Sequence, residues 1–179
     1  MADKIKLGVI GFGNMGTGHV SNLMTGACPE IELVAICDKN PDRIAFAKSK
    51  YPESNFKYFT DAIEMLDSGL IDSCLVAVPH YDHTTYSIEC MKRGIHVMCE
   101  KPAGVYTKQI REMNDESEKH PEVVFGMMFN QRTNPIYRKM HDLVQSGVYG
   151  EIRRTNWLIT NWFRSQAYYN SSDWRATWA

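Results

Sequence analysis

The sequence predicts an α/β fold with a doubly wound parallel sheet. Strand-like and helix-like segments alternate along most of the chain. Most of the strand-like segments are near-continuous apolar runs, such as Cys74-Leu75-Val76-Ala77-Val78, which a sheet covered by helices on both faces requires. The first apolar run leads directly into a glycine-rich turn, Gly11-Phe12-Gly13-Asn14-Met15-Gly16. This combination is typical of a Rossmann-type fold.

The individual elements follow from apolar periodicity and from residues that begin or end helices. We expect strands at residues 4–10, 31–37, 56–59, 73–78, 95–99 and 122–129. We expect helices at residues 14–26, 41–50, 61–68, 82–93, 107–119 and 134–146.

Several residues mark the helix ends. Asn40 and Asn134 each precede a proline, which predicts an N-cap followed by proline at the first helical position. Asp82 is expected to cap the helix that follows it. Gly94 and Gly147 follow predicted helices, where a positive φ favours glycine.

The character of the chain changes near residue 130. The four tryptophans all come after this point, at positions 157, 162, 174 and 178. Residues 152–163 alternate loosely and are rich in β-forming types, which predicts a strand of a different, antiparallel sheet. A single strand cannot bury one face alone. We therefore predict a domain over residues 1–129 and the incomplete beginning of an α+β second domain over residues 130–179.

The composition excludes several classes of partner. The chain has 179 residues, a net charge of -1 and 44% hydrophobic residues, so it offers no clustered basic surface for nucleic acid. No apolar run approaches the roughly 20 residues that cross a bilayer. The N-terminus lacks the apolar region of a signal peptide. We expect a cytoplasmic protein that binds neither nucleic acid nor membranes.

The cysteines predict neither a disulfide framework nor a metal site. The five are Cys28, Cys37, Cys74, Cys90 and Cys99, and they include no C-x-x-C pair and no zinc-like spacing with histidine. We expect buried free thiols in a reducing compartment and no bound metal.

The glycine-rich turn predicts a dinucleotide site. Gly11 permits a tight turn, Gly13 lets the backbone approach a pyrophosphate, and Gly16 lets the next helix pack closely on the strand. The N–H groups and the positive end of that helix would then face the phosphates. We assign all six residues of the turn, 11–16, to cofactor binding. The alternative is a purely structural turn.

The second predicted strand ends at Asp38, 22 residues after Gly16. A carboxylate near this spacing accepts hydrogen bonds from the adenosine ribose and repels a 2′-phosphate, so NAD is favoured over NADP. Lys39 and Arg43 lie close by in the sequence and leave NADP open. The structural alternative for Asp38 is a surface acid before a helix.

The loop after the fourth predicted strand is expected to line the cofactor cleft, because ligands bind outside the carboxyl ends of parallel strands. It carries Pro79, His80 and His83, which we assign to cofactor binding. For each histidine, a solvated or capping role is an equal alternative.

Glu100-Lys101-Pro102 follows the fifth predicted strand. A lysine at this position would project over the cleft, bind a substrate oxygen and transfer a proton during hydride exchange. Glu100 would orient Lys101 or reach the cofactor ribose. Pro102 would shape the turn, and the Lys101–Pro102 bond is a candidate for the cis form. The alternative is an ordinary solvated turn.

These motifs together resemble the Gfo/Idh/MocA oxidoreductases, a family named for glucose-fructose oxidoreductase and inositol dehydrogenase. The resemblance runs from about residue 4 to the end of the chain. It rests on the glycine turn with His19 three residues later, and on four further segments: residues 78–83, 94–102, 130–132 with Pro135, and 146–152.

The resemblance implies an NAD(P)-dependent enzyme that transfers a hydride between nicotinamide and a secondary alcohol of a sugar, cyclitol or related polyol. It implies that Lys101 is the catalytic lysine, that Glu100 and Pro102 belong to the cofactor-side motif, and that the second domain serves substrate binding and homo-oligomerisation.

Two departures from the family pattern are visible. His80 stands where the family usually has asparagine, and the family's catalytic aspartate and histidine have no counterpart in the chain. We therefore expect the chain to bind cofactor but to be inactive by itself. The alternative function is a non-catalytic NAD(P) sensor or scaffold. An unpaired strand edge in the second domain would also promote self-association.

Overall fold

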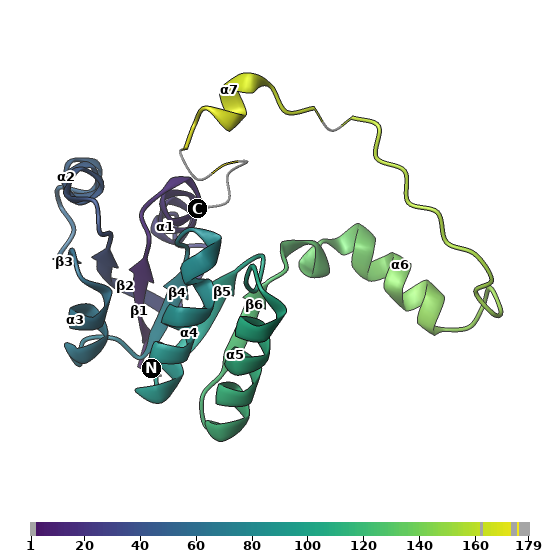
Figure 1. Ribbon diagram of the computed structural model, residues 1–179, viewed down its shortest axis with the longest axis horizontal. Helices are drawn as coiled ribbons and strands as arrows, with labels where there is room; N and C mark the ends of the chain where they lie inside the picture. The colour runs from purple at the N-terminus through teal and green to yellow at the C-terminus, as the bar shows by residue number, and fades with distance from the viewer. Residues whose placement is uncertain (1–2, 162, 173–174, 176–179) are drawn as a thin grey trace. The chain divides into compact units, whose positions relative to one another are not determined.

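The computed structural model describes residues 3–161, 163–172 and 175. The chain divides into two compact units, residues 1–129 and 130–179 (Figure 1). The first unit contains a sheet of six strands in the order β3-β2-β1-β4-β5-β6, and every neighbouring pair is parallel. The strands are β1 (Ile5–Ile10), β2 (Ile31–Cys37), β3 (Lys57–Phe59), β4 (Ser73–Val76), β5 (His96–Glu100) and β6 (Phe125–Met128). The predicted doubly wound parallel sheet is confirmed.

Helices cover both faces of this sheet. They are α1 (Asn14–Met24), α2 (Pro41–Lys50), α3 (Ala62–Asp67), α4 (His83–Lys92) and α5 (Thr107–Lys119). Val20 of α1 and Ile44 of α2 share one core cluster with Val9 of β1. On the opposite face, α3, α4 and α5 pack against the sheet and contribute Met65, Met91 and Met113 to a second cluster. Successive strand residues alternate between the two clusters, because neighbouring side chains of a strand point to opposite faces.

Two strands are shorter than the sequence predicts by two residues or more. The predicted strand at 73–78 ends at Val76, and the predicted strand at 122–129 is formed only over Phe125–Met128. β6 lies at the edge of the sheet and pairs only with β5, where the register covers the four residues from Phe125 to Met128. An apolar run continues past the last paired residue, so apolar periodicity cannot locate the end of the ladder.

The helix boundaries confirm most of the predicted caps. The side chain of Asn40 accepts a bond from the Asp42 N–H at 2.9 Å, and Asn134 accepts one from the Ile136 N–H at 2.9 Å. Gly94 has a φ of 70°, as a residue after a helix end requires.

The predicted Asp82 cap is wrong. Asp82 belongs to the short 3₁₀ helix η1 (His80–Asp82), and its side chain makes no capping bond. Its φ of -96° and ψ of -4° are nearly helical, whereas a capping side chain reaches the helix amides from an extended backbone.

The second unit contains η2 (Asn130–Thr133), α6 (Pro135–Gln145) and α7 (Gln166–Tyr169). The strand predicted over 152–163 is not formed in the described residues 152–161 and 163, and residue 162 lies outside the description. A strand needs a neighbour that shares its hydrogen bonds, and the part of the second unit that the structure describes provides none. Trp174 and Trp178 also lie outside the described residues. Among the described helices, none combines the length and apolarity needed to cross a membrane.

The contact between α1 and the turn after β1 generates the first prediction. A Cβ at Gly16 would lie 1.8 Å from the backbone oxygen of Gly11, so we expect Gly16→Ala to lower the free energy of unfolding by about 3 kcal/mol or more. Gly18, on the same helix, has no atom within 4 Å of its Cβ position. We expect Gly18→Ala to stabilise the chain by about 0.5–1 kcal/mol.

Urea unfolding of the two variants and the parent measures this difference. A Gly16→Ala variant as stable as Gly18→Ala would contradict the close packing of α1 on the turn.

Candidate active site

The residues that the sequence assigns to cofactor and catalysis lie at or directly after the ends of four strands, in loops, at the end of β5 and at the starts of α1 and α4. Because β1, β2, β4 and β5 are parallel neighbours, their carboxyl ends meet at one edge of the sheet (Figure 1). The glycine turn follows β1, Asp38 follows β2, the loop with Pro79 and His80 follows β4, and Lys101 follows β5. The order of the strands reverses between β1 and β4, which is where α/β sheets open a ligand crevice.

The glycine turn is held close to the loop after β4. Gly11 has a φ of 96°, and a Cβ there would lie 2.6 Å from the oxygen of Ala77. Gly13 differs, because nothing lies within 4 Å of its Cβ position. Gly13 also precedes α1 without any side-chain cap, so the first amides of this helix are not capped by that residue. The turn is therefore tight on its inner side and open at Gly13.

The other residues of the turn differ in exposure. The side chain of Phe12 is fully buried in the core. Asn14 and Met15 are exposed at the start of α1. Of these three residues, only Asn14 and Met15 can present side chains to a cofactor.

Asp38 fixes the shape of the turn. One carboxylate oxygen accepts a bond from the buried Phe12 N–H at 2.7 Å, and the other accepts one from the Asn40 N–H at 2.9 Å. A carboxylate oxygen has two acceptor positions, so Asp38 retains the capacity to accept from a ribose hydroxyl. Sequence spacing predicted that the residue accepts from a ribose and did not indicate that it also anchors the loop after β1.

Glu100 is buried at the end of β5 and links two elements. Its Oε1 lies 2.7 Å from Nε2 of His19 on α1, and its Oε2 accepts a bond from the Lys101 N–H at 3.0 Å. The carboxylate therefore orients the backbone of the lysine, which is one of the two roles that the sequence suggested. Sequence reasoning named His19 only as part of a motif, and its spacing gave no sign of this contact 81 residues away.

Lys101 itself is exposed at the carboxyl edge. The peptide bond to Pro102 is cis, as the sequence suggested. The ring of His80 meets that of His83 at a centroid distance of 5.5 Å, nearly edge to face.

His83 is placed differently from the cofactor contact that the sequence assigns. Its side chain is buried, at 1% exposure, and both ring nitrogens lie within 2.8 Å of backbone carbonyl oxygens. His83 therefore lies inside the protein.

Comparison with known proteins identifies the family. The model of the GFO_IDH_MocA family, described as "Oxidoreductase family, NAD-binding Rossmann fold", matches residues 5–129. The chain belongs to this family. A myo-inositol 2-dehydrogenase of Thermotoga maritima is 31% identical over 147 residues, which are 82% of this chain and 42% of the relative.

Solved structures of family members are similar to the chain as well. A scyllo-inositol dehydrogenase of Lactobacillus casei with bound NAD(H) and scyllo-inositol matches with a TM-score of 0.76 and 27% identity, over 83% of this chain and 43% of that one. The WlbA dehydrogenase of Bordetella pertussis, in complex with NADH and UDP-GlcNAcA, matches with a TM-score of 0.86 and 25% identity, over 99% of this chain and 50% of that one. The chain spans less than half the length of the curated relatives that it matches first.

The cysteines near this edge of the GFO_IDH_MocA domain are poorly suited to act as nucleophiles. Cys37 and Cys99 lie at or near the ends of β2 and β5 and are buried. Burial raises the pKa of the Cys37 thiol to about 12 and that of Cys99 to about 11. Both thiols are therefore protonated near neutral pH, and a protonated thiol is a poor nucleophile.

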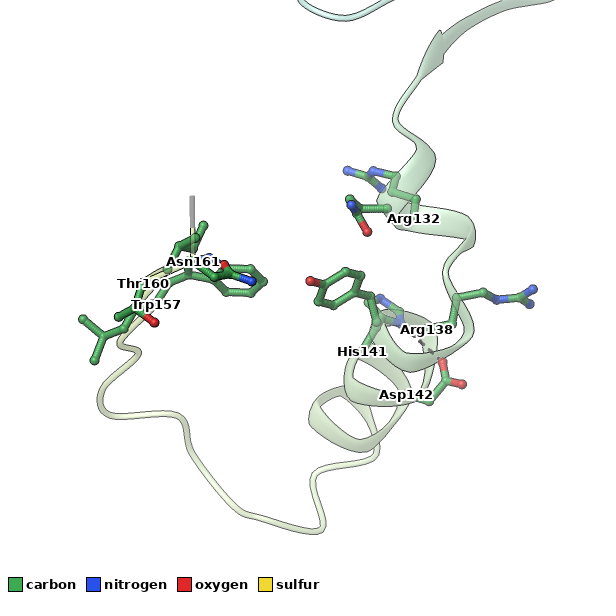
Figure 2. Close-up of a pocket in the computed structure, with 11 residues that line it drawn as sticks. Arg132, Arg138, His141, Asp142, Trp157, Thr160 and Asn161 are labelled. Carbon is green, nitrogen blue, oxygen red and sulfur yellow. Dashed lines mark hydrogen bonds and ion pairs between the residues drawn. The ribbon is translucent and has the colours of Figure 1, made fainter. Parts of the chain in front are cut away.

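The second unit of this family member has a hollow of its own. It has a volume of about 1530 Å³ and lies between α6 and the extended chain near Trp157 (Figure 2). Arg132, Arg138 and His141 line one side, and Trp157 and Asn161 come from the other.

An aromatic contact spans this hollow. The rings of Tyr137 and Trp157 approach to a centroid distance of 5.8 Å. His141 pairs with Asp142 at 3.3 Å. Cationic and aromatic side chains thus line one concave surface.

The two bonds of Asp38 generate the second prediction. Asp38→Ala leaves the buried Phe12 N–H without its acceptor, so we expect the free energy of unfolding to fall by about 1–3 kcal/mol. Asp38→Asn keeps one oxygen acceptor and should lose less. Asp42→Ala removes an exposed acid from the first turn of α2 and should lose only about 0.3–1 kcal/mol.

Chemical denaturation of the three variants tests the role of Asp38. Equal stability of Asp38→Ala and Asp42→Ala would show that the carboxylate does not hold the turn.

Proposed function

We propose that this chain forms the cofactor-binding half of an NAD(P)-dependent oxidoreductase, which transfers a hydride between nicotinamide and a secondary alcohol of a sugar, cyclitol or related polyol. The observation that carries the proposal is the convergence of Gly13, Asp38 and Lys101 at one edge of a parallel sheet in a chain of an NAD-binding family. Two of the named relatives are inositol dehydrogenases, and inositols are cyclitols.

The residues of the edge fit a dinucleotide. The open side of Gly13 and the uncapped start of α1 suit a pyrophosphate, which binds backbone N–H groups at a helix N-terminus. Asp38 suits a ribose hydroxyl and repels a 2′-phosphate, which favours NAD and leaves NADP as the second choice. When bound, the nicotinamide supplies the carbon that gives or accepts the hydride.

Lys101 is proposed as the catalytic residue. It is exposed at the carboxyl edge, and its backbone is oriented by the buried Glu100. Its ammonium would bind the alcohol or carbonyl oxygen of the substrate and exchange a proton with it. The side chains proposed to contact the cofactor from the other loops are Asn14, Met15, Pro79 and His80, and Pro102 shapes the turn after the lysine.

A nucleotide-linked sugar acid is a second candidate substrate. The similarity to the UDP-GlcNAcA complex covers 99% of the chain and includes the second unit. In that unit, Arg132 and Trp157 line the hollow, whereas the side chain of Arg138 points away from Trp157 (Figure 2). Arginine suits phosphates and carboxylates, and an aromatic ring suits a base or a sugar face. The hollow therefore supports an anionic substrate as an alternative to a neutral polyol.

The alternative function is an NAD(P) sensor or scaffold without catalysis. Such a protein needs the glycine turn and Asp38 but no group that reaches a substrate oxygen, so the exposed Lys101 favours the enzyme. We further propose that the protein is a homo-oligomer that assembles through its second unit. A cytoplasmic location fits its five free cysteines, since disulfides are rare in reducing compartments.

The open side of Gly13 generates the third prediction. Gly13→Val should fold, because its Cβ meets no atom within 4 Å and its φ of -76° suits any residue. Its side chain would occupy the space through which a pyrophosphate approaches the amides, so we expect the affinity for NADH to fall at least about tenfold.

NADH fluorescence titration measures this affinity, with Gly18→Ala as the control that should bind like the parent. The cofactor site is misplaced if Gly13→Val binds NADH as tightly as the parent chain.

Catalysis by Lys101 is the fourth prediction. The family's catalytic aspartate and histidine have no counterpart in the chain, so we expect slow reduction of NAD with myo-inositol or UDP-GlcNAcA. Lys101→Met should lower that residual rate by about 100-fold or more, because a positioned acid or base contributes about 10²–10⁴. Lys108→Met removes an exposed lysine of α5 and should leave the rate unchanged.

Following the absorbance of NADH with each substrate separates the candidates. The faster of the two substrates identifies the class. Rates near the enzyme median of about 10 s⁻¹ would contradict the expected low activity.

A further inference from the structure

Two side chains from distant parts of the chain meet at the buried end of β5. The side chain of Glu100 is 5% exposed, and its Oε1 lies 2.7 Å from Nε2 of His19, a residue of α1 whose side chain is 20% exposed. The Oε2 of Glu100 accepts a bond from the Lys101 N–H at 3.0 Å. One carboxylate therefore contacts both the helix that follows the glycine turn and the residue proposed for catalysis.

The chemistry of the carboxylate determines the roles in these two bonds. An ionised carboxylate only accepts hydrogen bonds, so both partners donate to it. The Lys101 amide is always a donor, and the His19 ring donates from Nε2 in its neutral Nε2–H tautomer as well as in its charged form. The bridge therefore does not depend on the charge of the ring. Burying a carboxylate is costly unless its oxygens meet donors, and these contacts supply one to each oxygen.

The backbone of Lys101 depends on this carboxylate because the sheet no longer holds it. The ladder between β5 and β6 ends at the pair Glu100 and Met128. Lys101 is the next residue, and Pro102 after it has no N–H to donate. The bond to Oε2 of Glu100 therefore anchors the lysine beyond the end of the ladder.

The contact with His19 restricts the rotation of the carboxylate. A carboxylate held at one oxygen still turns about its side-chain bonds, whereas here each oxygen is tied to a different element. Without His19, Oε1 is left buried without its donor, which is costly. The carboxylate then gains by rotating towards water, and this rotation moves Oε2 away from the Lys101 N–H.

We propose that His19 is a positioning residue for the proposed catalytic lysine. Through Glu100 it fixes the turn that carries Lys101 relative to α1, the helix whose N-terminus is proposed to bind the pyrophosphate. The glycine turn itself is held separately, by Asp38, so His19 affects hydride transfer and not the affinity for the cofactor. The effect on catalysis rests on the function proposed above, whereas the effect on the Lys101 backbone does not.

Two substitutions separate the bridge from simple packing. The amide nitrogen of glutamine reaches about the position of a histidine Nε2, so His19→Gln keeps a donor for Oε1. His19→Leu provides a side chain without any donor. If His19→Leu does not fold, His19→Asn replaces it, because its shorter amide reaches only the position of Nδ1. The matched control, His120→Leu, changes a histidine after the end of α5 whose ring contacts Glu116 and Glu122.

Hydrogen exchange at the Lys101 amide, followed by NMR of the full chain, tests the bridge directly. Each rate is compared with that of the Val97 amide, which bonds the Val124 carbonyl inside the sheet. We expect the relative exchange rate of Lys101 to rise at least about tenfold in His19→Leu, and to stay within about threefold of the parent in His19→Gln and His120→Leu. An unchanged rate in His19→Leu, or an equal rise in His19→Gln, would overturn the proposal.

The kinetic consequence is a separation of rate from binding. With myo-inositol or UDP-GlcNAcA, we expect His19→Leu to lower the rate of NAD reduction about tenfold or more, while its affinity for NADH stays within about twofold of the parent. His19→Gln should recover most of the rate. A fall in NADH affinity as large as the fall in rate, or no recovery with glutamine, contradicts the proposal. If the parent neither binds NADH nor reacts, the proposed function fails, while the exchange of the Lys101 amide still decides whether His19 orients the lysine.

Discussion

The bond from the Phe12 N–H to the carboxylate of Asp38 organises the carboxyl edge of the sheet. It joins the turn after β1 to the end of β2, and its donor belongs to a residue whose side chain is fully buried. Without it, a buried N–H would have no acceptor, which is expensive in a protein interior. The close approach of Gly16 to the Gly11 carbonyl adds a second constraint, because no side chain fits between α1 and the turn at this position.

A similar device repeats at the next strand ends. Glu100 is buried at the end of β5, and its two oxygens bond the Lys101 N–H and the His19 ring. His83 bonds the carbonyls of the loops after β4 and β5. Each loop that carries a proposed functional group thus has a backbone group in hydrogen-bond contact with the side chain of Asp38, Glu100 or His83. The exposed Lys101 and the open Gly13 can be positioned accurately only because these buried groups are fixed, which is how a rigid scaffold supports a site.

The described residues of the second unit include large apolar side chains that are exposed. α6 exposes large apolar side chains, among them Ile136 and Met140, and the extended chain that follows exposes Leu158 at 88%. The rings of Tyr137 and Trp157 contact each other across the hollow. Contacts of this type cannot hold a sheet, and the strand predicted over 152–163 is accordingly not formed among the residues that the structure describes.

The sequence alone determined the features that depend on neighbouring residues. Apolar runs located all six strands of the sheet, Asn40 and Asn134 located helix starts, and the glycine spacing identified the turn after β1. These features follow from local periodicity and local hydrogen bonds, which a short segment contains within itself. The family resemblance of the same motifs agrees with the family match over residues 5–129.

Only the tertiary structure decided which groups meet across the fold. His19 and Glu100 are 81 residues apart, and the ring of His83 is buried against two backbone carbonyl oxygens. The predicted Asp82 cap is not formed because the backbone of Asp82 is nearly helical. The strand predicted over 152–163 is not formed in the described residues because strand pairing needs a partner from elsewhere in the chain. Contacts between distant segments depend on how the chain closes its loops, and residue spacing along the sequence does not record that.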